Sequence, residues 1–440
     1  MTERFCRTET GKGGMHMDED RTLIIGLDLC DDYSQISCIR KNGQLPLGEP
    51  ESVCMTPDKT KYLIPTAVCV RENSKEWIIG EEAERCRERQ AGQYVDGLFS
   101  MIENDSSATI YDVEFTGEML LERFLRKLLG IIRQRYQNNS ILQIVVTLPG
   151  NYRKTEAALP GILEKLGIGE DRAQIINHTL AFMYYVVSQP KDQWVNDVAL
   201  FEYGIGGLQF YQLSFGRKSL PNTVVAEHTD LSDKIPYEMY LHHVTDRLTK
   251  GFETESNMAL YKKLITSVFV SGRGFEGTWA DNVLRNMCMG RRVFKGQNLY
   301  AKGACYAAAS LINNTLTEYI FLSEDRITSD ISLKVVSNGE EQLIPLANVG
   351  EPWQTAGRKC RVIPDGNAEL EFLVSDCIRK DSVQEIVRLD SPVRRENKTV
   401  RLELALRFED RRTAVVKISD TGFGEFFKSS YRVWEQILKL

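Results

Sequence analysis

The sequence predicts a duplicated α/β domain followed by an all-β sandwich domain. Three observations lead to this fold class. Residues 21–190 alternate strand patterns with helix patterns. The pattern starts again after Pro190, where DVALFEYGIGGLQFYQLSF repeats the strand, glycine turn and strand of residues 21–40. From about Tyr319 onward, helical spacing gives way to short alternating strands separated by turn signals, which is typical of a sandwich.

Length and composition narrow the class of protein. The 440 residues carry a net charge of −6, which favours neither a nucleic-acid nor an anionic-membrane partner. No apolar run approaches the ~20 residues that span a bilayer. Residues 1–20 lack the apolar core of a signal peptide and predict a disordered tail. Ten cysteines without a CxxC pair indicate reduced thiols and no zinc site. We therefore expect a cytoplasmic protein with no nucleic-acid or membrane partner.

The first lobe, residues 21–190, is expected to combine strands and helices. Apolar residues at helical spacing, among them Leu120, Phe124 and Leu128, predict a helix at 116–138. A strand of the buried type, ILQIVVTLP, follows this helix. The other predicted strands lie at 22–29, 35–40, 62–70 and 77–80, and the other helices at 154–166 and 179–188.

The second lobe, residues 191–315, is expected to repeat this plan with fewer residues. It opens with two strands within 197–215 and continues with a strand at 267–271 and the glycine turn GRGFEG. Helical patterns occupy 237–252, 257–264, 278–289 and 299–313.

The last part of the chain is predicted to be a linker, 316–330, a β-sandwich, 331–430, and one terminal helix, 431–440. The dipeptides Asn338-Gly339 and Asp365-Gly366 mark turns between its strands. The acidic loop at 338–341 favours a basic or polar segment if it binds a partner, and a solvated hairpin is the alternative interpretation of the same residues.

Carboxylates and glycines at the strand ends predict a phosphate site. A phosphate chain needs backbone N–H groups that glycines allow to come close, and carboxylates at strand ends hold the waters of Mg²⁺. Asp28 ends the first strand, and Glu202 ends its counterpart in the second lobe. The remaining candidates are the glycines of two turns, Gly204, Gly206, Gly207, Gly272 and Gly274.

Ten short segments, taken together, are similar to those of the 70 kDa heat-shock chaperone (Hsp70) family within the actin-like ATPase superfamily. These segments are spread along the chain from residue 26 to residue 424. The segments are GLDL (26–29), IP (64–65), IGEEA (79–83), VTLP (146–149), INHT (176–179), FEYGIGG (201–207), VSGRG (270–274), AKGA (301–304), LIP (343–345) and SDTGFG (419–424).

The resemblance implies a ribonuclease H-like, actin-like ATPase domain with two lobes, followed by a peptide-binding sandwich. The second lobe is reduced, because only about fifty residues separate Phe215 from Ser267 where the family has more than twice as many. ATP or ADP with Mg²⁺ is the implied ligand, and Asp28 and Glu202 would hold the waters of Mg²⁺ without direct metal ligands. The implied nucleotide-binding residues are Asp28, Cys30, Asp31, Gly204, Gly206, Gly207, Gly272, Arg273 and Gly274.

The same comparison shows departures at the positions that carry catalysis. Cys30, Asp31 and Asp32 replace the glycine and hydroxyl residues of the first phosphate segment, and His178 replaces the catalytic glutamate. Gly207 takes the place of a hydroxyl residue, and no lysine occurs from residue 76 to residue 126, where the family has its essential one. A carboxylate about 5 Å from a phosphate oxygen opposes binding by about 3 kcal/mol at an effective dielectric constant near 20.

These departures leave Asp28, His178 and Glu202 as the remaining catalytic candidates and predict little or no ATP hydrolysis, that is, a pseudo-ATPase. The first hypothesis is therefore a chaperone-like protein that holds another protein or a peptide with its sandwich and keeps a degenerate ATP-binding cleft. One alternative is a working ATP-dependent chaperone whose site uses substitutes such as His178 as a base and the Asp31-Asp32 turn with Mg²⁺. The other is an actin-like module that assembles into filaments or a complex.

Overall fold

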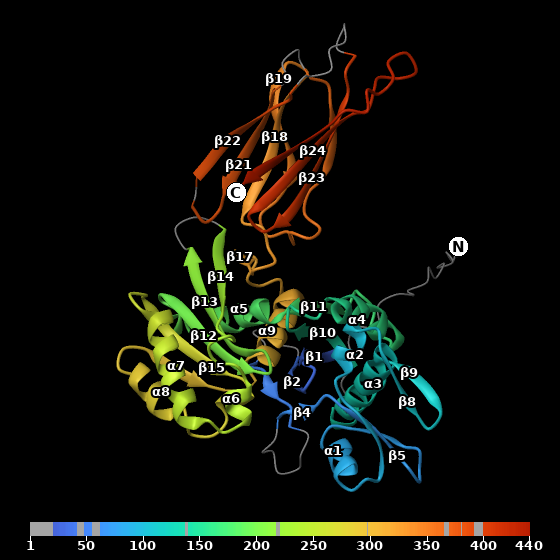
Figure 1. Cartoon of the computed structure of the whole chain (residues 1–440), viewed down its shortest axis with the longest axis vertical. Helices are drawn as coiled ribbons and strands as arrows, with labels where there is room; N and C mark the ends of the chain where they lie inside the picture. The colour runs from blue at the N-terminus through green and yellow to red at the C-terminus, as the bar shows by residue number, and fades with distance from the viewer. Residues whose placement is uncertain are drawn as a thin grey trace, which may run out of the picture. The chain divides into compact units, whose positions relative to one another are not determined.

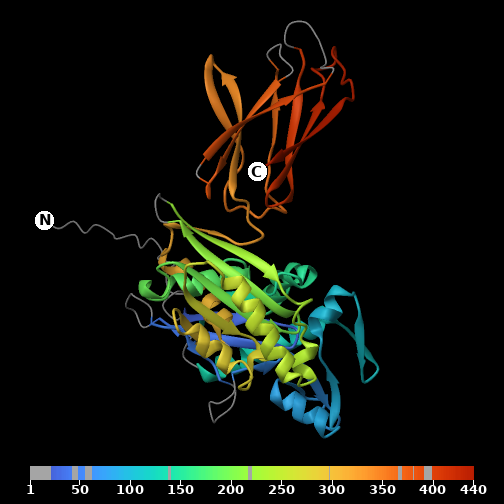
Figure 2. The same cartoon turned by 60° about the vertical axis from the view of Figure 1, so that its left-hand side comes forward.

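The computed structural model (Figure 1; Figure 2) describes residues 21–41, 48–54, 62–136, 140–216, 221–296, 298–364, 369–379, 381–390 and 399–440. The predicted tail at 1–20 and the turn predicted at Asp365-Gly366 lie outside these residues. The chain forms two compact units. The first runs to Gln193 and includes Gly296–Thr315, and the second comprises Trp194–Lys295 and Leu316–Leu440.

The first unit is built on one mixed sheet in the order β11-β10-β1-β2-β3. Strand β1 pairs antiparallel with β2 and parallel with β10, and β10 pairs parallel with β11. A short strand, β4, also pairs with β2. The strands are β1 (Arg21–Asp28), β2 (Tyr33–Arg40), β3 (Glu51–Ser52), β4 (Ile64–Pro65), β10 (Ser140–Leu148) and β11 (Ala173–Asn177).

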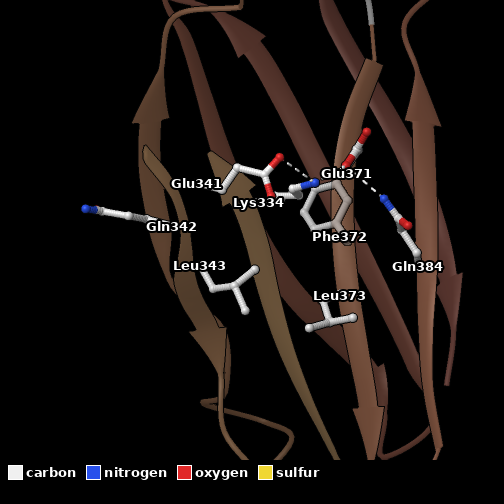
Figure 3. A pocket seen from close by; sticks show the side chains of 8 residues that line it. All are labelled: Lys334, Glu341, Gln342, Leu343, Glu371, Phe372, Leu373 and Gln384. Atoms are coloured by element: carbon white, nitrogen blue, oxygen red, sulfur yellow. Dashed lines mark hydrogen bonds and ion pairs between the residues drawn. The ribbon is translucent and has the colours of Figure 1, made fainter. Parts of the chain in front are cut away.

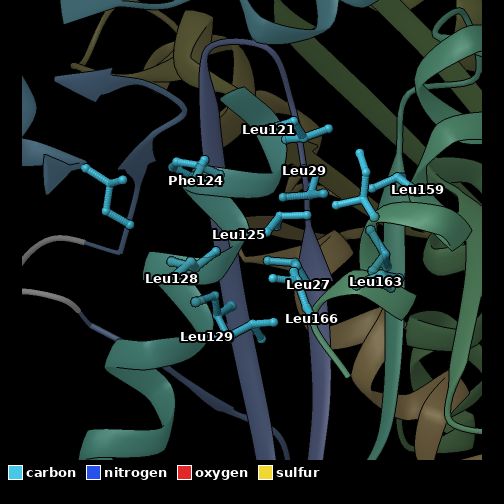
Figure 4. Close-up of a cluster of buried hydrophobic side chains, with 14 of the residues drawn as sticks. Leu27, Leu29, Leu121, Phe124, Leu125, Leu128, Leu129, Leu159, Leu163 and Leu166 are labelled. Atoms are coloured by element: carbon cyan, nitrogen blue, oxygen red, sulfur yellow. The ribbon is translucent and has the colours of Figure 1, made fainter. Parts of the chain in front are cut away.

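Helices cover both faces of this sheet because its strands alternate the direction of their side chains. Leu27 and Leu29 point into a leucine-rich core with α3 (Gly117–Arg135) and α4 (Arg153–Lys165) (Figure 4). The hydroxyl of Thr116 accepts a hydrogen bond from Met119 N and so caps α3, as the predicted start of this helix requires. The remaining elements of the first unit are β5 (Val68–Arg71), β6 (Trp77–Ile79), α1 (Glu81–Glu88), β7 (Gly92–Val95), α2 (Leu98–Glu103), β8 (Ser107–Ile110), β9 (Val113–Thr116), α5 (His178–Val187), the 3₁₀ turn η1 (Lys191–Gln193) and α9 (Leu299–Asn313).

On the opposite face of the sheet, the backbone of α9 packs directly against the backbone of β1. A Cβ added to Gly26 would lie 2.1 Å from the carbonyl oxygen of Ala301 and 2.2 Å from Cys305 N. A Cβ added to Gly303 would lie 2.0 Å from the carbonyl oxygen of Ala181 in α5. Only glycine fits at these two positions, and α9 is therefore seated directly on β1 and α5.

This packing corrects the predicted domain boundary. Residues 299–313 form a helix with the predicted bounds, but α9 belongs to the first unit and not to the second lobe at 191–315. The backbone of α9 at Ala301 and Cys305 lies against Gly26 of β1, and Gly303 lies against Ala181 of α5, so the contacts of this helix are with elements of the first unit.

The second unit contains a sheet with the same plan as the first. Its order is β16-β15-β12-β13-β14-β17, and β12 pairs antiparallel with β13 and parallel with β15, as β1 does with β2 and β10. Its core packs β12, β13 and β15 against helices α7 and α8. The elements are β12 (Asp197–Gly204), β13 (Gly207–Gly216), β14 (Asn222–Asp230), α6 (Glu238–Leu241), α7 (Thr245–Leu260), β15 (Ile265–Ser271), the 3₁₀ turn η2 (Arg273–Phe275), α8 (Asp281–Met287), β16 (Arg292–Lys295) and β17 (Tyr319–Leu322).

The rest of the second unit is a β-domain of two four-stranded antiparallel sheets whose buried side chains form one core. Leu333 and Phe372 enter this core from the first sheet, and Leu404 and Val416 enter it from the second. The first sheet has the order β19-β18-β21-β22, and the second has the order β20-β23-β24-β25. The strands are β18 (Ser329–Ser337), β19 (Glu340–Ala347), β20 (Lys359–Val362), β21 (Glu369–Asp376), β22 (Asp381–Arg388), β23 (Leu402–Asp410), β24 (Thr413–Asp420) and β25 (Val433–Lys439).

Two further predictions for this part of the chain are wrong. The segment 431–440 is not a helix, because Val433–Lys439 form strand β25 and pair with β24 along its whole length. A segment this short is marginal as an isolated helix, whereas the unpaired edge of β24 offers it a full row of hydrogen bonds. The predicted linker 316–330 contains strand β17, which pairs with β14, and the beginning of β18.

The turn predicted at Asn338-Gly339 is confirmed. Both residues have positive φ, 53° and 84°, and they join β18 to β19 as a two-residue hairpin loop. Among the helices within the described ranges, none has the length and apolar character that crossing a membrane requires.

Replacing Gly26 by alanine tests the packing of α9 on β1. We expect Gly26→Ala to lower the free energy of unfolding by about 3 kcal/mol, because the added methyl group collides with backbone atoms that cannot rotate away. Chemical denaturation followed by circular dichroism measures this change. Gly130→Ala in the middle of α3, where the added methyl group meets nothing within 4 Å, is the matched control and should stabilise the protein by up to about 1 kcal/mol. Equal effects of the two variants would contradict the close approach.

Candidate functional site

Three chemically active side chains of the first unit meet at one edge of its sheet. Asp28 is the last residue of β1, Cys30 follows in the turn, and His178 begins α5 directly after β11. Strands β1, β10 and β11 are parallel, so their carboxyl ends lie at the same edge, where sites of open α/β sheets form. His178 Nε2 lies 2.8 Å from Asp28 Oδ1. Cys30 Sγ lies 3.7 Å from the same carboxylate oxygen and 3.8 Å from His178 Nε2.

The imidazole of this cluster is held by its neighbours. Asn177 accepts a hydrogen bond from Leu180 N at 2.8 Å and thereby fixes the first turn of α5, which carries His178. Tyr300 of α9 stacks on the imidazole, with ring centroids 3.9 Å apart and planes inclined by 13°. Asp28 and His178 are buried, and Cys30 is half-buried. The cluster is therefore a positioned group and not a set of mobile surface side chains.

Two buried polar atoms flank Asp28 on the neighbouring strands. Asp28 pairs with Gln35 on β2 and with Thr147 on β10, and paired residues of adjacent strands direct their side chains to the same face. Gln35 Oε1 and Thr147 Oγ1 are buried and have no hydrogen-bond partner among the described residues. Such atoms are rare in folded proteins and call for an explanation.

Asp31 is engaged elsewhere. One oxygen of its carboxylate accepts a hydrogen bond from Phe99 N at 2.7 Å, and the other accepts one from Ser100 N at 3.3 Å, at the beginning of α2. The carboxylate therefore satisfies N–H groups that the helix leaves open and lies at its positive end. Asp32 accepts a hydrogen bond from Tyr33 N at 2.8 Å. Whether these two aspartates face a phosphate could not be decided from the sequence, and both carboxylates accept hydrogen bonds from backbone N–H groups.

The second unit holds the counterpart residues of the predicted phosphate site. Glu202 is in β12 and pairs with Gln209 and with Ser271. The predicted glycine turn is a tight hairpin in which Gly204 and Gly207 pair and Ile205 and Gly206 form the loop. Gly207 has a φ of +74°, and a Cβ there would lie 2.5 Å from Ser232 Cβ. The packing of this hairpin against Ser232 thus explains why position 207 requires glycine.

The third glycine turn also packs against the protein itself. A Cβ on Gly272, which has a φ of +99°, would lie 2.3 Å from the carbonyl oxygen of Tyr203, and a Cβ on Gly274 would lie 2.2 Å from the Tyr203 ring. Burial raises the pKa of the Tyr203 phenol well above its usual value, so the hydroxyl stays protonated and donates to the carbonyl oxygen of Pro236. Trp279 Nε1 donates to the carbonyl oxygen of Gly274 at 2.8 Å, while Arg273 lies between the two glycines in η2.

The β-domain carries a pocket of about 350 Å³ that sequence reasoning did not identify (Figure 3). Lys334 lies at its centre, with its Nζ 3.0 Å from Glu341 Oε1 and 3.5 Å from Glu371 Oε2. The hydrogen bond to Glu341 raises the pKa of Lys334, and Gln384 Nε2 donates to Glu371 at 2.8 Å. The residues that line the pocket are Lys334, Glu341, Gln342, Leu343, Glu371, Phe372, Leu373 and Gln384.

The pocket combines residues of four strands, and no single segment of the sequence shows it. The acidic loop at 338–341 and the segment LIP at 343–345 were the available signals. Their convergence with Glu371 and Gln384 depends on the register of β18, β19, β21 and β22.

The fold and its clusters define a class of protein with two α/β sheets of the same plan and an antiparallel β-domain. Residues 49–324 match the family described as "Family of unknown function (DUF5716) C-terminal", and residues 326–440 match a domain of unknown function, DUF8552. The first match spans well over half of the chain, and the chain belongs to the DUF5716 family. No curated protein matches the sequence. His178 and Glu202 lie within the first match, whereas Asp28 and Cys30 precede it.

Removing the carboxylate of Asp31 tests its role at α2. We expect Asp31→Ala to lower the free energy of unfolding by about 0.5–2 kcal/mol, because the first N–H groups of α2 lose their acceptor. Asp31→Asn keeps an acceptor oxygen and should lose less. Urea denaturation measures both variants, and Asp233→Ala, at an exposed carboxylate, is the control. A loss no greater than that of Asp233→Ala would show that the bonds to α2 do not contribute.

Proposed function

We propose that the chain is a chaperone-like interaction protein of Hsp70-like architecture that holds a polypeptide segment on its β-domain. Its α/β part has an actin-like ATPase fold and hydrolyses little or no ATP. The observation that carries this proposal is the pocket on the outer face of sheet β19-β18-β21-β22.

The repeated sheet plan supports the proposed fold. Both α/β sheets place one central strand antiparallel to the next strand of the chain and parallel to a later one. A duplicated domain of the kind that the resemblance implies requires such a repeat. The two sheets of the β-domain share one core in the manner of a β-sandwich.

The chemistry of the outer sheet face supports a polypeptide as its occupant. Lys334 pairs with Leu343, and Val336 pairs with Glu341, so all four side chains point away from the core that Leu333 enters. Leu343 is 52% exposed and Val336 is 70% exposed. Apolar side chains thus alternate with charged ones on this face, and a polypeptide can offer both kinds of complement.

The balance of charge specifies the segment further. Two carboxylates, Glu341 and Glu371, face one ammonium group, Lys334, so the pocket carries an excess of negative charge. We therefore propose that the bound segment is extended and places arginine or lysine next to an apolar residue. An anionic segment would meet the uncompensated carboxylate.

Several features of the α/β part support the loss of hydrolysis. The carboxylate of Asp28, which would hold the waters of Mg²⁺, bonds instead to His178. Tyr203 of the same unit occupies the space beside Gly272 and Gly274. The sequence offers no lysine from residue 76 to residue 126. Positive groups aimed at the transferred phosphoryl group are worth about 10³ or more in rate, and their absence removes most of the catalysis.

One observation favours a second candidate function, a working ATPase. The bond between Asp28 and His178 is of the kind that orients an imidazole as a general base. In this alternative His178 would take the place of the missing glutamate. The two candidates differ in whether phosphate is released.

The state of the cysteines supports a cytoplasmic location for the proposed function. No disulfide joins the nine cysteines of the described ranges. Burial raises the pKa of Cys38 and of Cys69 to about 12, so these thiols are poor nucleophiles and resist oxidation. Free thiols of this kind are typical of a reducing compartment.

A pair of labelled peptides tests the proposed binding face. We expect a heptapeptide of alternating leucine and arginine to bind the chain in fluorescence anisotropy, and its leucine–glutamate counterpart to bind at least tenfold more weakly. Leu343→Ser should weaken the first peptide about tenfold, because an exposed apolar contact is lost. Ile437→Ser, at a residue of similar exposure on β25 of the other sheet, is the matched control. Equal weakening by both variants, or equal binding of both peptides, would contradict the proposal.

A phosphate-release assay separates the two candidate functions. With millimolar Mg²⁺-ATP we expect the purified chain to release phosphate no faster than buffer, and His178→Ala to leave the rate unchanged, because the cluster does not act on phosphate. Steady release that Asp28→Asn abolishes would establish the working ATPase in its place. Binding of the arginine peptide is measured separately, so failure of one part of the proposal is distinguishable from failure of the other.

A further inference from the structure

We propose that Asp28, Cys30 and His178 form a binding site for a transition-metal ion of the zinc class. The proposal is independent of the peptide-binding face. It goes against the expectation from sequence, which found no CxxC pair and no direct metal ligand. Cys30 and His178 are 148 positions apart, and only the sheet edge brings them together.

The donor atoms suit such an ion. Thiolate, imidazole and carboxylate are the three kinds of ligand that Zn²⁺ takes in proteins, and three protein ligands leave a fourth position for water. The Asp28 carboxylate and the Cys30 thiolate together supply two negative charges, which balance a divalent ion in this buried place. Hard ions such as Mg²⁺ prefer an all-oxygen set and are disfavoured by the sulfur ligand.

The distances between the donor atoms also suit it. Bonds of about 2.0–2.3 Å in a tetrahedral arrangement place the donor atoms about 3.3–3.7 Å apart. Cys30 Sγ lies 3.7 Å from Asp28 Oδ1 and 3.8 Å from His178 Nε2. The third separation, 2.8 Å between Nε2 and Oδ1, is that of a hydrogen bond. An ion that replaces the proton between these two atoms needs them to open by about half an ångström.

Two buried oxygens provide independent support. Gln35 is 4% exposed and Thr147 is fully buried, and the strand register places both beside Asp28, one on each neighbouring strand. Gln35 Oε1 and Thr147 Oγ1 have no partner among the described residues. Water bound to a metal ion carries strongly polarised O–H groups, which are the kind of donor that these oxygens lack.

The geometry argues against a different use of the cluster, a cysteine nucleophile with a relaying imidazole. In such a relay the nucleophile and the carboxylate bond to different ring nitrogens, so that the proton passes across the ring. Here Cys30 Sγ and Asp28 Oδ1 both approach Nε2 of His178. Convergence of three donors on one point is instead the arrangement that a metal ion requires. On binding, the ion takes the thiolate sulfur and the lone pair of His178 Nε2. The thiol proton leaves to solvent, and the neutral imidazole carries its proton on Nδ1.

Titration of the full chain with Co²⁺ tests the site directly. After treatment with a chelator, we expect one equivalent of Co²⁺ to produce the near-ultraviolet absorption of a thiolate–cobalt bond, and Zn²⁺ to abolish it by displacement. Cys30→Ser should weaken Zn²⁺ binding at least a hundredfold and remove the absorption band. Cys288→Ser, at an exposed free thiol, should keep both. Absence of the band from the unaltered chain, or its persistence in Cys30→Ser, would overturn the proposal.

A second variant keeps the test valid if Cys30→Ser does not fold. Thr147→Val removes the unpartnered hydroxyl without changing the size of the side chain. Without metal its melting temperature should equal or exceed that of the unaltered chain, because a buried polar atom without a partner is lost. Its affinity for Zn²⁺ should fall tenfold to a hundredfold, as is usual when a group that orients a ligand is removed. An unchanged Zn²⁺ affinity in Thr147→Val would contradict the role of this hydroxyl, and stabilisation by Mg²⁺ equal to that by Zn²⁺ would contradict the metal class.

Discussion

The contact of α9 with β1 at Gly26 is the constraint on which the first unit depends. Because no side chain stands between them, the helix lies on the strand at backbone distance, and Gly303 brings α5 equally close. This arrangement sets the position of Tyr300, which stacks on His178 and so faces the Asp28–Cys30–His178 cluster. The position of α9 thus sets the ring that packs on His178, while the three donor residues of the cluster come from other elements.

Glycine and aspartate at a strand end serve two purposes that a sequence does not distinguish. They allow a phosphate to approach, and they equally allow one piece of backbone to pack against another. Gly26, Gly207, Gly272 and Gly274 each have a neighbouring group of their own unit where a Cβ would be. Asp31 likewise uses its charge on the first turn of α2. Several residues that the sequence predicts to form a phosphate site are thus used by the fold for its own packing.

The sequence predicts those features of the fold that depend on local periodicity. The bounds of α9 and the hairpin β1–β2 follow from apolar spacing and turn residues. Strand β25 is different, because its apolar pattern suits a helix as well and the free edge of β24 decides between them. The allocation of α9 to the first unit also depends on distant partners and is not visible locally.

The candidate sites divide in the same way. Asp28 and His178 could be singled out because a family resemblance places both beside a phosphate, but their direct bond depends on the parallel register of β1, β10 and β11. The sequence shows Cys30 as a departure from the family pattern. It does not show that Cys30 lies in a cluster of three donor residues. The pocket around Lys334 requires the registers of four strands, and nothing in the linear order of the residues indicates them.

The placement of α9 has a consequence for folding during synthesis on the ribosome. Synthesis proceeds from the N-terminus, so β1 is made long before the helix that covers it. Cys305 Sγ lies 3.8 Å from the carbonyl oxygen of Ile24, across 281 positions of sequence. Until α9 leaves the exit tunnel, the β1 face with Gly26 and Asp28 lacks its cover, and the nascent first unit exposes a surface that other chains can capture. The first unit is therefore completed only after strands β12 to β16 of the second unit have been synthesised.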